Sequence, residues 1–331
     1  SRAGVLPMPI KWFSIPQCWR YERMQKGRGR EHFQWNVDIW GTNEISADAE
    51  LFSVLTTFLE GVGLTEEDVV IRVSSRKVLE EILGALGITG DLFAKTCIIV
   101  DKMDKLSPEV IDEQLTELGH DSKVIATIQS TLGLKHLNSL KKVLKPDSAA
   151  LSELTQLFEA IDAYGISNWV EFDASIVRGL AYYTGSVFEV NDRKGKFRAI
   201  CGGGRYDKLL STLGGKDLPA TGFGFGDMVI MELLKDKGLI PHLLSGVEDV
   251  VIALDPNLKN IAVKVASVLR DSDRLVDLVL ENKKMKWAFK HAERVGASRI
   301  ILVAPEEWSR EKIKVKDLQS GEEFETTLEE I

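Results

Sequence analysis

The sequence predicts a protein of the α/β class with two domains: an α+β core over residues 1–240 and a smaller α/β domain over residues 247–331. Polar and apolar residues alternate through Glu31–Trp40, which is typical of a half-buried strand. Residues 91–165 are rich in Leu, Glu and Lys at helical spacing, which predicts a helical insertion in the core. After a change of composition near residues 238–248, strand and helix patterns alternate, as in an α/β domain.

The bulk composition excludes several classes of protein. A chain of 331 residues that is 44% hydrophobic and 28% charged has the composition of a globular protein. No apolar run approaches the roughly 18 residues that a membrane helix needs, so no membrane partner is expected. The net charge of −8 argues against wholesale coating of nucleic acid but leaves room for local basic patches. The 3 cysteines lie far apart with no C-x-x-C pair, so we expect no disulfide framework, no zinc and no other protein-bound metal.

The first strands carry the polar groups of interest. Lys11–Tyr21 reads as one strand, edge-like or bulged because it contains a proline, and residues 24–29 read as a loop. The alternation in Glu31–Trp40 puts Phe33, Trp35, Val37 and Ile39 on one face and His32, Gln34, Asn36 and Asp38 on the other. Amide, imidazole and carboxylate groups suit substrate recognition better than they suit a solvated face, which remains the alternative.

Helices and strands then alternate up to residue 240. Helices are expected at Ala47–Gly61, Arg76–Leu86 and Met228–Lys237, and strands at Val69–Ser74, Trp169–Asp173, Gly185–Asn191 and Phe197–Cys201. The run G-G-G-R-Y-D at Gly202–Asp207 predicts a tight turn before a helix at Tyr206–Leu213, or equally a stretch of bare backbone for a ligand. In Pro219–Asp227, glycines alternate with phenylalanines, which predicts a strand with one bare face that suits a flat ring such as adenine.

The second domain has a simpler pattern. Strands are expected at Val250–Leu254, Val276–Leu280 and Arg299–Val303, helices at Leu258–Asp271 and Met285–Val295, and a final hairpin around Asp317–Glu323. Since each of these strands is separated from the next by a helix, we expect the strands to be parallel.

Two arginine-rich segments point to a polyphosphate and a small polar substrate. The first, Trp19–Gln34, gathers five cations around a glycine-containing turn: Arg20, Arg23, Lys26, Arg28 and Arg30. Such a cluster is costly unless an anion joins it, and a guanidinium at Arg20 could hold an α-phosphate. Taken alone, Arg20 could instead pair with Glu22 or Glu31 at the surface. The second segment, Val177–Gly185, places an arginine beside a glycine and two adjacent tyrosines.

Together these motifs resemble those of histidyl-tRNA synthetases, a family of class II aminoacyl-tRNA synthetases, and most closely a plant-like form. W-R-Y-E-R…R-G-R-E-H-F-Q resembles class II motif 2, and P-A-T-G-F-G-F-G-D occupies the place of motif 3. V-R-G-L-A-Y-Y-T-G-S-V-F-E and G-G-G-R-Y-D resemble the two histidine-specific motifs, which are the more diagnostic pair. The resemblance implies an antiparallel catalytic sheet flanked by helices, followed by an anticodon-binding domain.

The resemblance also implies roles for individual residues. Arg20 and Arg178 would be catalytic and would contact the α-phosphate and the bound histidine. Histidine would further be bound by Gln34, Asp38, Tyr182 and Tyr183, with the phenols bonding the imidazole nitrogens. ATP would be held by Arg20, Glu22 at the adenine amino group, Arg28 at the outer phosphates, His32 and Gly224. On the helix Met285–Val295, Lys286, Lys290 and Arg294 would contact tRNA, although a solvated helix face is the simpler interpretation of their spacing.

Several positions depart from the family pattern. Ala181 replaces an acidic residue, His32 replaces a phenylalanine that stacks on adenine, and Val229 replaces the motif 3 arginine for the γ-phosphate, so that Arg28, Arg30 or another cation must take its place. The chain starts at Ser1 and motif 1, which builds the class II dimer, is absent, so the sequence is expected to lack its N-terminal part. Whether this piece is active or dimeric by itself is left open, whereas a homodimer is expected for the full-length parent.

The predicted function is ligation of histidine to tRNA(His). Histidine would be activated by ATP with Mg²⁺ to histidyl-adenylate and then transferred to the terminal ribose of the tRNA. The alternative is a non-catalytic, synthetase-like regulator that senses histidine or uncharged tRNA; the missing motif 3 arginine favours it, whereas Arg20 and Arg178 argue against it. The expected compartment is the cytoplasm, with chloroplast or mitochondrion as the alternative because a targeting segment could precede Ser1.

Overall fold

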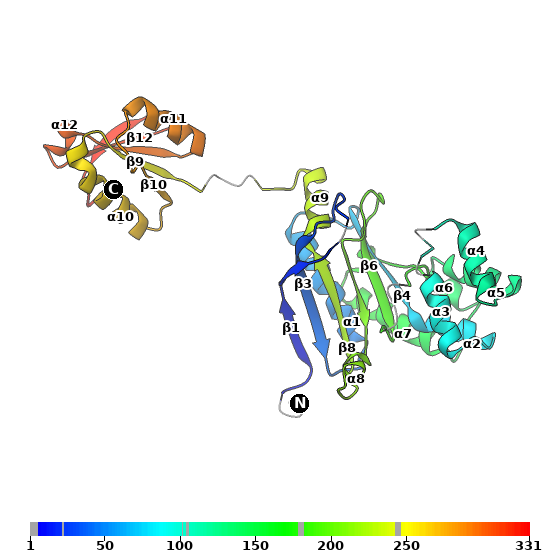
Figure 1. Cartoon of the computed structure of the whole chain (residues 1–331). Coiled ribbons are helices and arrows are strands. Elements are labelled where there is room, and N and C mark those ends of the chain that lie inside the picture. The colour runs from blue at the N-terminus through cyan, green and yellow to red at the C-terminus, as the bar shows by residue number, and fades with distance from the viewer. Residues whose placement is uncertain (1–5, 22, 101, 104–105, 178–181, 242–245) are drawn as a thin grey trace. The chain divides into compact units, whose positions relative to one another are not determined.

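The computed structural model describes residues 6–21, 23–100, 102–103, 106–177, 182–241 and 246–331. The chain divides into two compact units, Ser1–Ile240 and Pro241–Ile331 (Figure 1). Each unit has its own sheet.

In the described residues, the first unit is built on a sheet of 8 strands in the order β1-β3-β8-β7-β6-β4-β5, with β2 also paired to β3. The strands are β1 (Ile10–Ser14), β2 (Gln17–Trp19), β3 (Glu31–Trp40), β4 (Val69–Ser75), β5 (Val170–Phe172), β6 (Ser186–Asp192), β7 (Cys201–Arg205) and β8 (Ala220–Gly226). All pairings are antiparallel except that of β4 with β5. The single strand expected over Lys11–Tyr21 is therefore two strands, separated at Ile15 and Pro16.

The glycine turn predicted for Gly202–Asp207 is wrong, because residues 201–205 form the buried strand β7 between β6 and β8. A Cβ atom on Gly203 would lie 2.2 Å from the carbonyl oxygen of Gly222 and 2.8 Å from the Cβ of Phe223. Only a residue without a side chain fits there, so Gly203 serves the packing of neighbouring strands, whereas Gly202 lines the pocket described below. The helix expected at Tyr206–Leu213 shortens to α8 (Leu209–Thr212).

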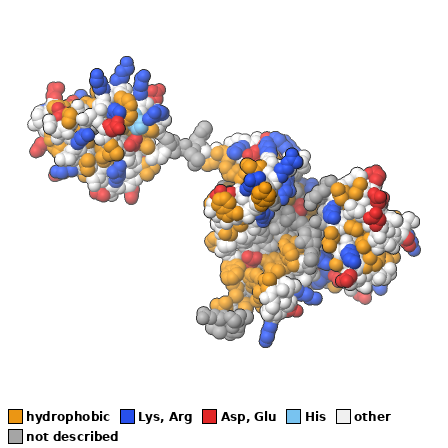
Figure 2. All heavy atoms as spheres, in the orientation of Figure 1, with side chains coloured by type: hydrophobic (Ala, Val, Ile, Leu, Met, Phe, Trp, Pro, Cys, Tyr) orange, Lys and Arg blue, Asp and Glu red, His pale blue; other side chains and the backbone are white. Residues whose placement is uncertain are grey.

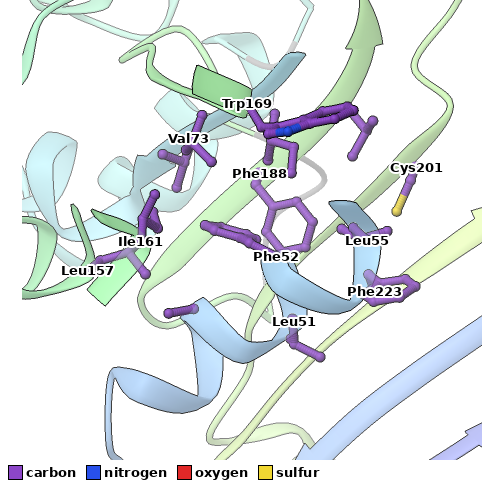
Figure 3. Packing of buried hydrophobic residues seen from close by; sticks show 14 of the residues in the cluster. Leu51, Phe52, Leu55, Val73, Leu157, Ile161, Trp169, Phe188, Cys201 and Phe223 are labelled. Carbon is purple, nitrogen blue, oxygen red and sulfur yellow. The ribbon is translucent and has the colours of Figure 1, made fainter. Parts of the chain in front are cut away.

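The other helices of the first unit are α1 (Ser46–Gly61), α2 (Arg76–Ala85), α3 (Gly90–Val100), α4 (Pro108–Glu117), α5 (Ser122–Leu132), α6 (Leu137–Leu140), α7 (Ala149–Ala163) and α9 (Asp227–Lys237). Helices α1 and α7 share the main core with the sheet, where the rings of Phe52 and Phe188 meet edge to face at 4.7 Å (Figure 3). Helices α2 to α5 supply a separate core around Leu83 and Leu115. Residues 91–165 were expected to form one helical insertion. Their helices instead pack into two different cores.

A buried ion pair joins the start of α1 to the middle of the sheet. Arg205 of β7 binds Asp48 in the first turn of α1, and both side chains are almost fully buried. Asp48 also accepts hydrogen bonds from the hydroxyls of Ser186 at 2.5 Å and Thr221 at 3.0 Å. Burial by itself would lower the pKa of Arg205, but the charge of Asp48 outweighs burial and raises it.

The second unit has a sheet of 5 strands in the order β10-β9-β11-β12-β13. Its elements are β9 (Asp249–Ala253), α10 (Lys259–Asp271), β10 (Val276–Leu278), α11 (Met285–Val295), β11 (Arg299–Val303), α12 (Pro305–Trp308), β12 (Ile313–Asp317) and β13 (Glu323–Thr326). Strands β10, β9 and β11 are parallel, and β12 and β13 form the expected hairpin. Among the helices that the structure describes, none is both long and apolar enough to cross a membrane.

Candidate active site

A large pocket lies on the face of the first sheet opposite the main core. Its floor is formed by alternate residues of β3 and β8, and its volume is about 880 Å³, within the range of small-molecule sites. On β3, Gln34, Asn36 and Asp38 line the pocket, as the alternation predicts. The opposite face carries Trp35, Val37 and Ile39 into the core, but Phe33 at the start of the strand remains 49% exposed.

The register of the strands arranges the floor in rows. Asp38 lies opposite Gly222 of β8, Asn36 opposite Gly224, and Gln34 opposite Gly226. A Cβ atom on Gly222 would lie 2.5 Å from the carboxylate of Asp38, and one on Gly224 would lie 2.9 Å from the amide nitrogen of Gln34. The protein's own side chains therefore use the space above two of the glycines that were expected to receive a ring. A Cβ atom on Gly226 would meet open space.

Asp38 is fixed in the pocket by Tyr206, whose hydroxyl donates a hydrogen bond to the carboxylate. Burial raises the pKa of Asp38, and the hydrogen bonds from Tyr206 and from the indole of Trp12 partly oppose that rise. Burial, together with the nearby Asp38, raises the pKa of the Tyr206 phenol, which therefore remains a neutral donor at physiological pH. Tyr206 was not predicted as a site residue, although the motif G-G-G-R-Y-D that contains it was singled out.

Arg20 and Gln34 are brought together at the other end of the floor. The backbone N–H of Arg20 donates to the carbonyl of Arg30 at 2.8 Å, which closes the loop between β2 and β3. The guanidinium donates to the side-chain oxygen of Gln34 at 3.3 Å, and the Gln34 amide donates to Asn36 at 2.6 Å. An ordered polar row thus connects the arginine to the centre of the pocket. The alternative pairing of Arg20 with Glu31 is not observed; Glu31 instead accepts from Gln17.

The basic loop between β2 and β3 forms the rim beside Arg20. Gly27, Arg28 and Gly29 line the pocket. The ammonium of Lys26 lies 3.5 Å from the carboxylate of Glu232, which ties this loop to α9. Figure 2 shows lysine and arginine side chains gathered on the first unit near α9. This end of the pocket is therefore suited to an anion.

The other residues predicted to bind histidine or ATP differ in how exposed they are and in whether the structure describes them. Tyr182 and Tyr183 both line the pocket with ring centroids 4.4 Å apart, but Tyr182 is 41% exposed whereas Tyr183 is 6% exposed. His32 also lines the pocket. Arg178, Glu22 and Ala181 lie outside the described residues, so the shared cleft expected for Arg20 and Arg178 stays a prediction.

The predicted tRNA-contacting residues lie on α11 of the second unit. Lys286, Lys290 and Arg294 are all exposed, while Ala288 and Ala292 form the buried side of the helix. Lysine and arginine side chains are visible on this unit in Figure 2. The Arg294 guanidinium bonds a ring nitrogen of His291 at 2.9 Å. The helix therefore presents a basic face, as its spacing predicts.

Comparison with known proteins relates the two units to two families. A model described as "Histidyl-tRNA synthetase" matches residues 4–227, and one described as "Anticodon binding domain" matches residues 249–331. A protein of Arabidopsis thaliana named "Histidine--tRNA ligase, chloroplastic/mitochondrial" is 52% identical over 324 residues, which cover 98% of this chain and 67% of the relative. A "Histidine--tRNA ligase" of Opitutus terrae is 36% identical over 337 residues, which cover 100% of this chain and 77% of the relative. The crystal structure of histidyl-tRNA synthetase from Nostoc sp. PCC 7120 superposes with a TM-score of 0.78 at 25% identity, covering 98% of this chain and 78% of that one.

Proposed function

The chain belongs to the histidyl-tRNA synthetase family, and on that premise we propose that it is a histidine–tRNA ligase that consumes ATP with Mg²⁺. One observation carries the proposal: the cationic rim with Arg20 and Arg28 and the half-buried carboxylate of Asp38 open into the same pocket. A guanidinium binds phosphate oxygens, and a fixed carboxylate binds an amino or imidazole N–H. The two ends of the pocket therefore suit the two substrates of the first half-reaction.

The chemistry follows from this arrangement. The carboxylate oxygen of histidine attacks the α-phosphorus of ATP, the bond to the outer phosphates breaks, and pyrophosphate leaves. Arg20 would offset the negative charge that develops at phosphorus, while Gln34 holds its guanidinium in place. A hydroxyl of the terminal ribose of tRNA then attacks the histidyl carbonyl, and AMP leaves.

We assign the histidine side of the pocket to Asp38, Gln34 and the two tyrosines Tyr182 and Tyr183. Their donors and acceptors would pair the polar atoms of histidine, and an apolar isostere would leave them unpaired. On the nucleotide side we assign Arg28, His32 and Gly224 to ATP, and we keep Glu22 and Arg178 in their predicted roles. Mg²⁺ would enter as part of the ATP substrate, since it is commonly bound through phosphate oxygens with one or two carboxylates. Among the described residues, no group of three or more His, Cys, Asp or Glu side chains is arranged to hold a metal.

The second unit would bind the anticodon of tRNA(His), with Lys286, Lys290 and Arg294 contacting phosphates. Its match to an anticodon-binding domain supports this assignment. We further propose a homodimer as the working form. For the compartment, the cytoplasm was expected, but the relative from Arabidopsis thaliana that is named chloroplastic/mitochondrial favours the organellar alternative.

The regulatory alternative is not favoured. The matched relatives are named ligases, and one of them shares 52% of its aligned residues with this chain. The chain also has a second unit that matches an anticodon-binding domain, which a protein that senses only histidine has no need of.

The direct test is exchange of labelled pyrophosphate into ATP. We expect exchange that depends on histidine and is absent with the other amino acids. Attachment of labelled histidine to a tRNA(His) transcript, with a tRNA of another specificity as the control, checks the second half-reaction. Histidine binding without any exchange or aminoacylation would contradict the ligase and favour the sensor.

Replacing Asp38 by asparagine should change the KM for histidine without lowering the stability of the fold. Because the folded-state pKa of Asp38 is raised above its ordinary value of 3.8, the ionised carboxylate costs stability at neutral pH. We therefore expect Asp38→Asn to keep or raise the melting temperature at pH 7, while the KM for histidine rises about 10- to 100-fold and that for ATP changes little. The stability difference between the two proteins should shrink as the pH falls towards 3.8, where the native carboxyl is protonated.

Asp147→Asn is the matched control, because Asp147 is exposed and lies outside the pocket. It should leave both KM values unchanged. An Asp38→Asn protein that melts several degrees lower at pH 7, or that retains the KM for histidine, would contradict the assignment.

A further inference from the structure

A third cation of the pocket, Arg198, was not predicted as a site residue. It lies in the connection between β6 and β7, a different element from the loop that carries Arg28, and it lines the pocket with an exposed side chain. The strand register places Arg198 at the end of the pocket where Arg20 and Gln34 lie. Strand β7 starts at Cys201, which pairs with Phe225 of β8. The next residue of β8, Gly226, pairs with Gln34. Arg198 therefore belongs to the cationic end.

The backbone around Arg198 is held in place from both sides. The carboxylate of Asp192 accepts hydrogen bonds from the backbone N–H groups of Lys196 at 2.8 Å and Phe197 at 2.9 Å. After the arginine, the N–H of Ile200 donates to the carbonyl of Val190 at 2.7 Å. The ammonium of Lys26 lies over the Phe197 ring at 5.3 Å, which connects this turn to the basic loop. The turn thus positions Arg198 before any ligand arrives.

The Arg198 guanidinium has no hydrogen bond, ion pair or ring contact with any of the described residues. Other arginines near the pocket are engaged: Arg20 with Gln34, and Arg30 over the ring of Tyr21 at 4.9 Å. An unengaged guanidinium on a fixed turn at a cationic pocket end is available to an anionic ligand.

The first turn of α9 offers no positive charge at this place: its one charged side chain is the acidic Asp227. Val229 lines the pocket, and its Cγ2 atom would lie 3.3 Å from a Cβ on Gly27, so the valine supports the basic loop by packing. Val229 stands where the family pattern has an arginine for the γ-phosphate. The cation that binds this phosphate must therefore come from another element.

We propose that Arg198, from the connection between β6 and β7, binds the β- and γ-phosphates of ATP and the pyrophosphate formed from them. This inference rests on the proposed function. It names the residue that supplies the missing cation of the ATP phosphate subsite. Arg198 would have no contact with the α-phosphate, so its contribution ends when pyrophosphate leaves.

Equilibrium binding of ATP and of AMP, measured by calorimetry on the whole chain, tests the proposal without any turnover. We expect Arg198→Ala to weaken ATP about 10- to 100-fold, the loss typical of one or two charge-assisted hydrogen bonds, and to leave AMP within about twofold. Arg198→Lys should recover part of the ATP affinity because it restores the charge but not the planar fork. Lys194→Ala, a cation of the same turn outside the pocket, should leave both affinities unchanged.

Kinetics provide a second measurement. The KM for pyrophosphate in the reverse reaction should rise in Arg198→Ala, whereas transfer of histidine from preformed histidyl-adenylate to tRNA should keep its rate. Equal ATP-to-AMP affinity ratios in wild type and Arg198→Ala would overturn the proposal, as would equal losses of ATP and AMP. If the wild type binds ATP more tightly than AMP through Arg198 but shows no histidine-dependent exchange, the phosphate subsite stands and the ligase function fails.

Discussion

Replacing Arg20 by alanine is expected to lower histidine-dependent pyrophosphate exchange about 100- to 1,000-fold while the protein stays folded. Loss of one fixed donor to a developing charge in a transition state typically has that effect. The side chain is exposed and makes one hydrogen bond, to Gln34, in the described structure, so its removal leaves the core intact. The rate of adenylate formation should fall much more than the affinity for ATP.

The measurement is exchange at saturating ATP and histidine, with thermal unfolding recorded on the same samples. Lys11→Ala is the control: this exposed cation on the neighbouring strand β1 pairs with Glu50 at 2.6 Å and does not line the pocket. Arg20→Ala with exchange within about threefold of the Lys11→Ala rate would show that another group neutralises the α-phosphate.

Replacing Arg205 by alanine is expected to destabilise the first unit by about 3–5 kcal/mol, because Asp48 would be left as a buried charge without its partner. Two carbonyl oxygens, of Thr42 and Glu44, would lose their donors as well. Since small proteins are stable by only about 5–15 kcal/mol, a substantial fraction of the molecules should unfold near physiological temperature.

Urea unfolding monitored by tryptophan fluorescence measures this change. Lys11→Ala, which breaks an exposed ion pair, should cost no more than about 1 kcal/mol. The double variant Asp48→Asn/Arg205→Met should be less destabilised than the sum of its single changes, because it leaves no unpaired charge. A loss below about 1 kcal/mol for Arg205→Ala would refute the structural role of this ion pair.

Most elements could be predicted from local sequence patterns. The strand Glu31–Trp40, the helix Met285–Val295 and the strand Arg299–Val303 were predicted with the bounds that the structure has. Each has a clear periodicity or a distinct end, such as the glycine that follows the helix at residue 296. The polar face of β3 was likewise visible from alternation, and it is the floor of the pocket.

The strand β7 could not be predicted in this way. Three consecutive glycines have no periodicity and are favoured in turns, so the local signal was misleading. The reason for a glycine at position 203 is the close approach of Gly222 and Phe223 on β8, residues nearly 20 positions away. Separation along the chain also concealed the hydrogen bond between Asp38 and Tyr206, which are 168 positions apart, and the position of Arg198 in the pocket.

The sequence by itself determined the class of fold, the family and the types of side chain that handle phosphate and histidine, because these depend on periodicity and on short motifs with fixed spacing. The tertiary structure decided which of those side chains share a pocket, which of them are engaged by neighbours, and which glycines serve packing instead of ligand binding. Those properties arise from pairs such as Arg205 with Asp48 and Asp38 with Tyr206, which are separated by more than 150 residues and meet only when the strands of the sheet align.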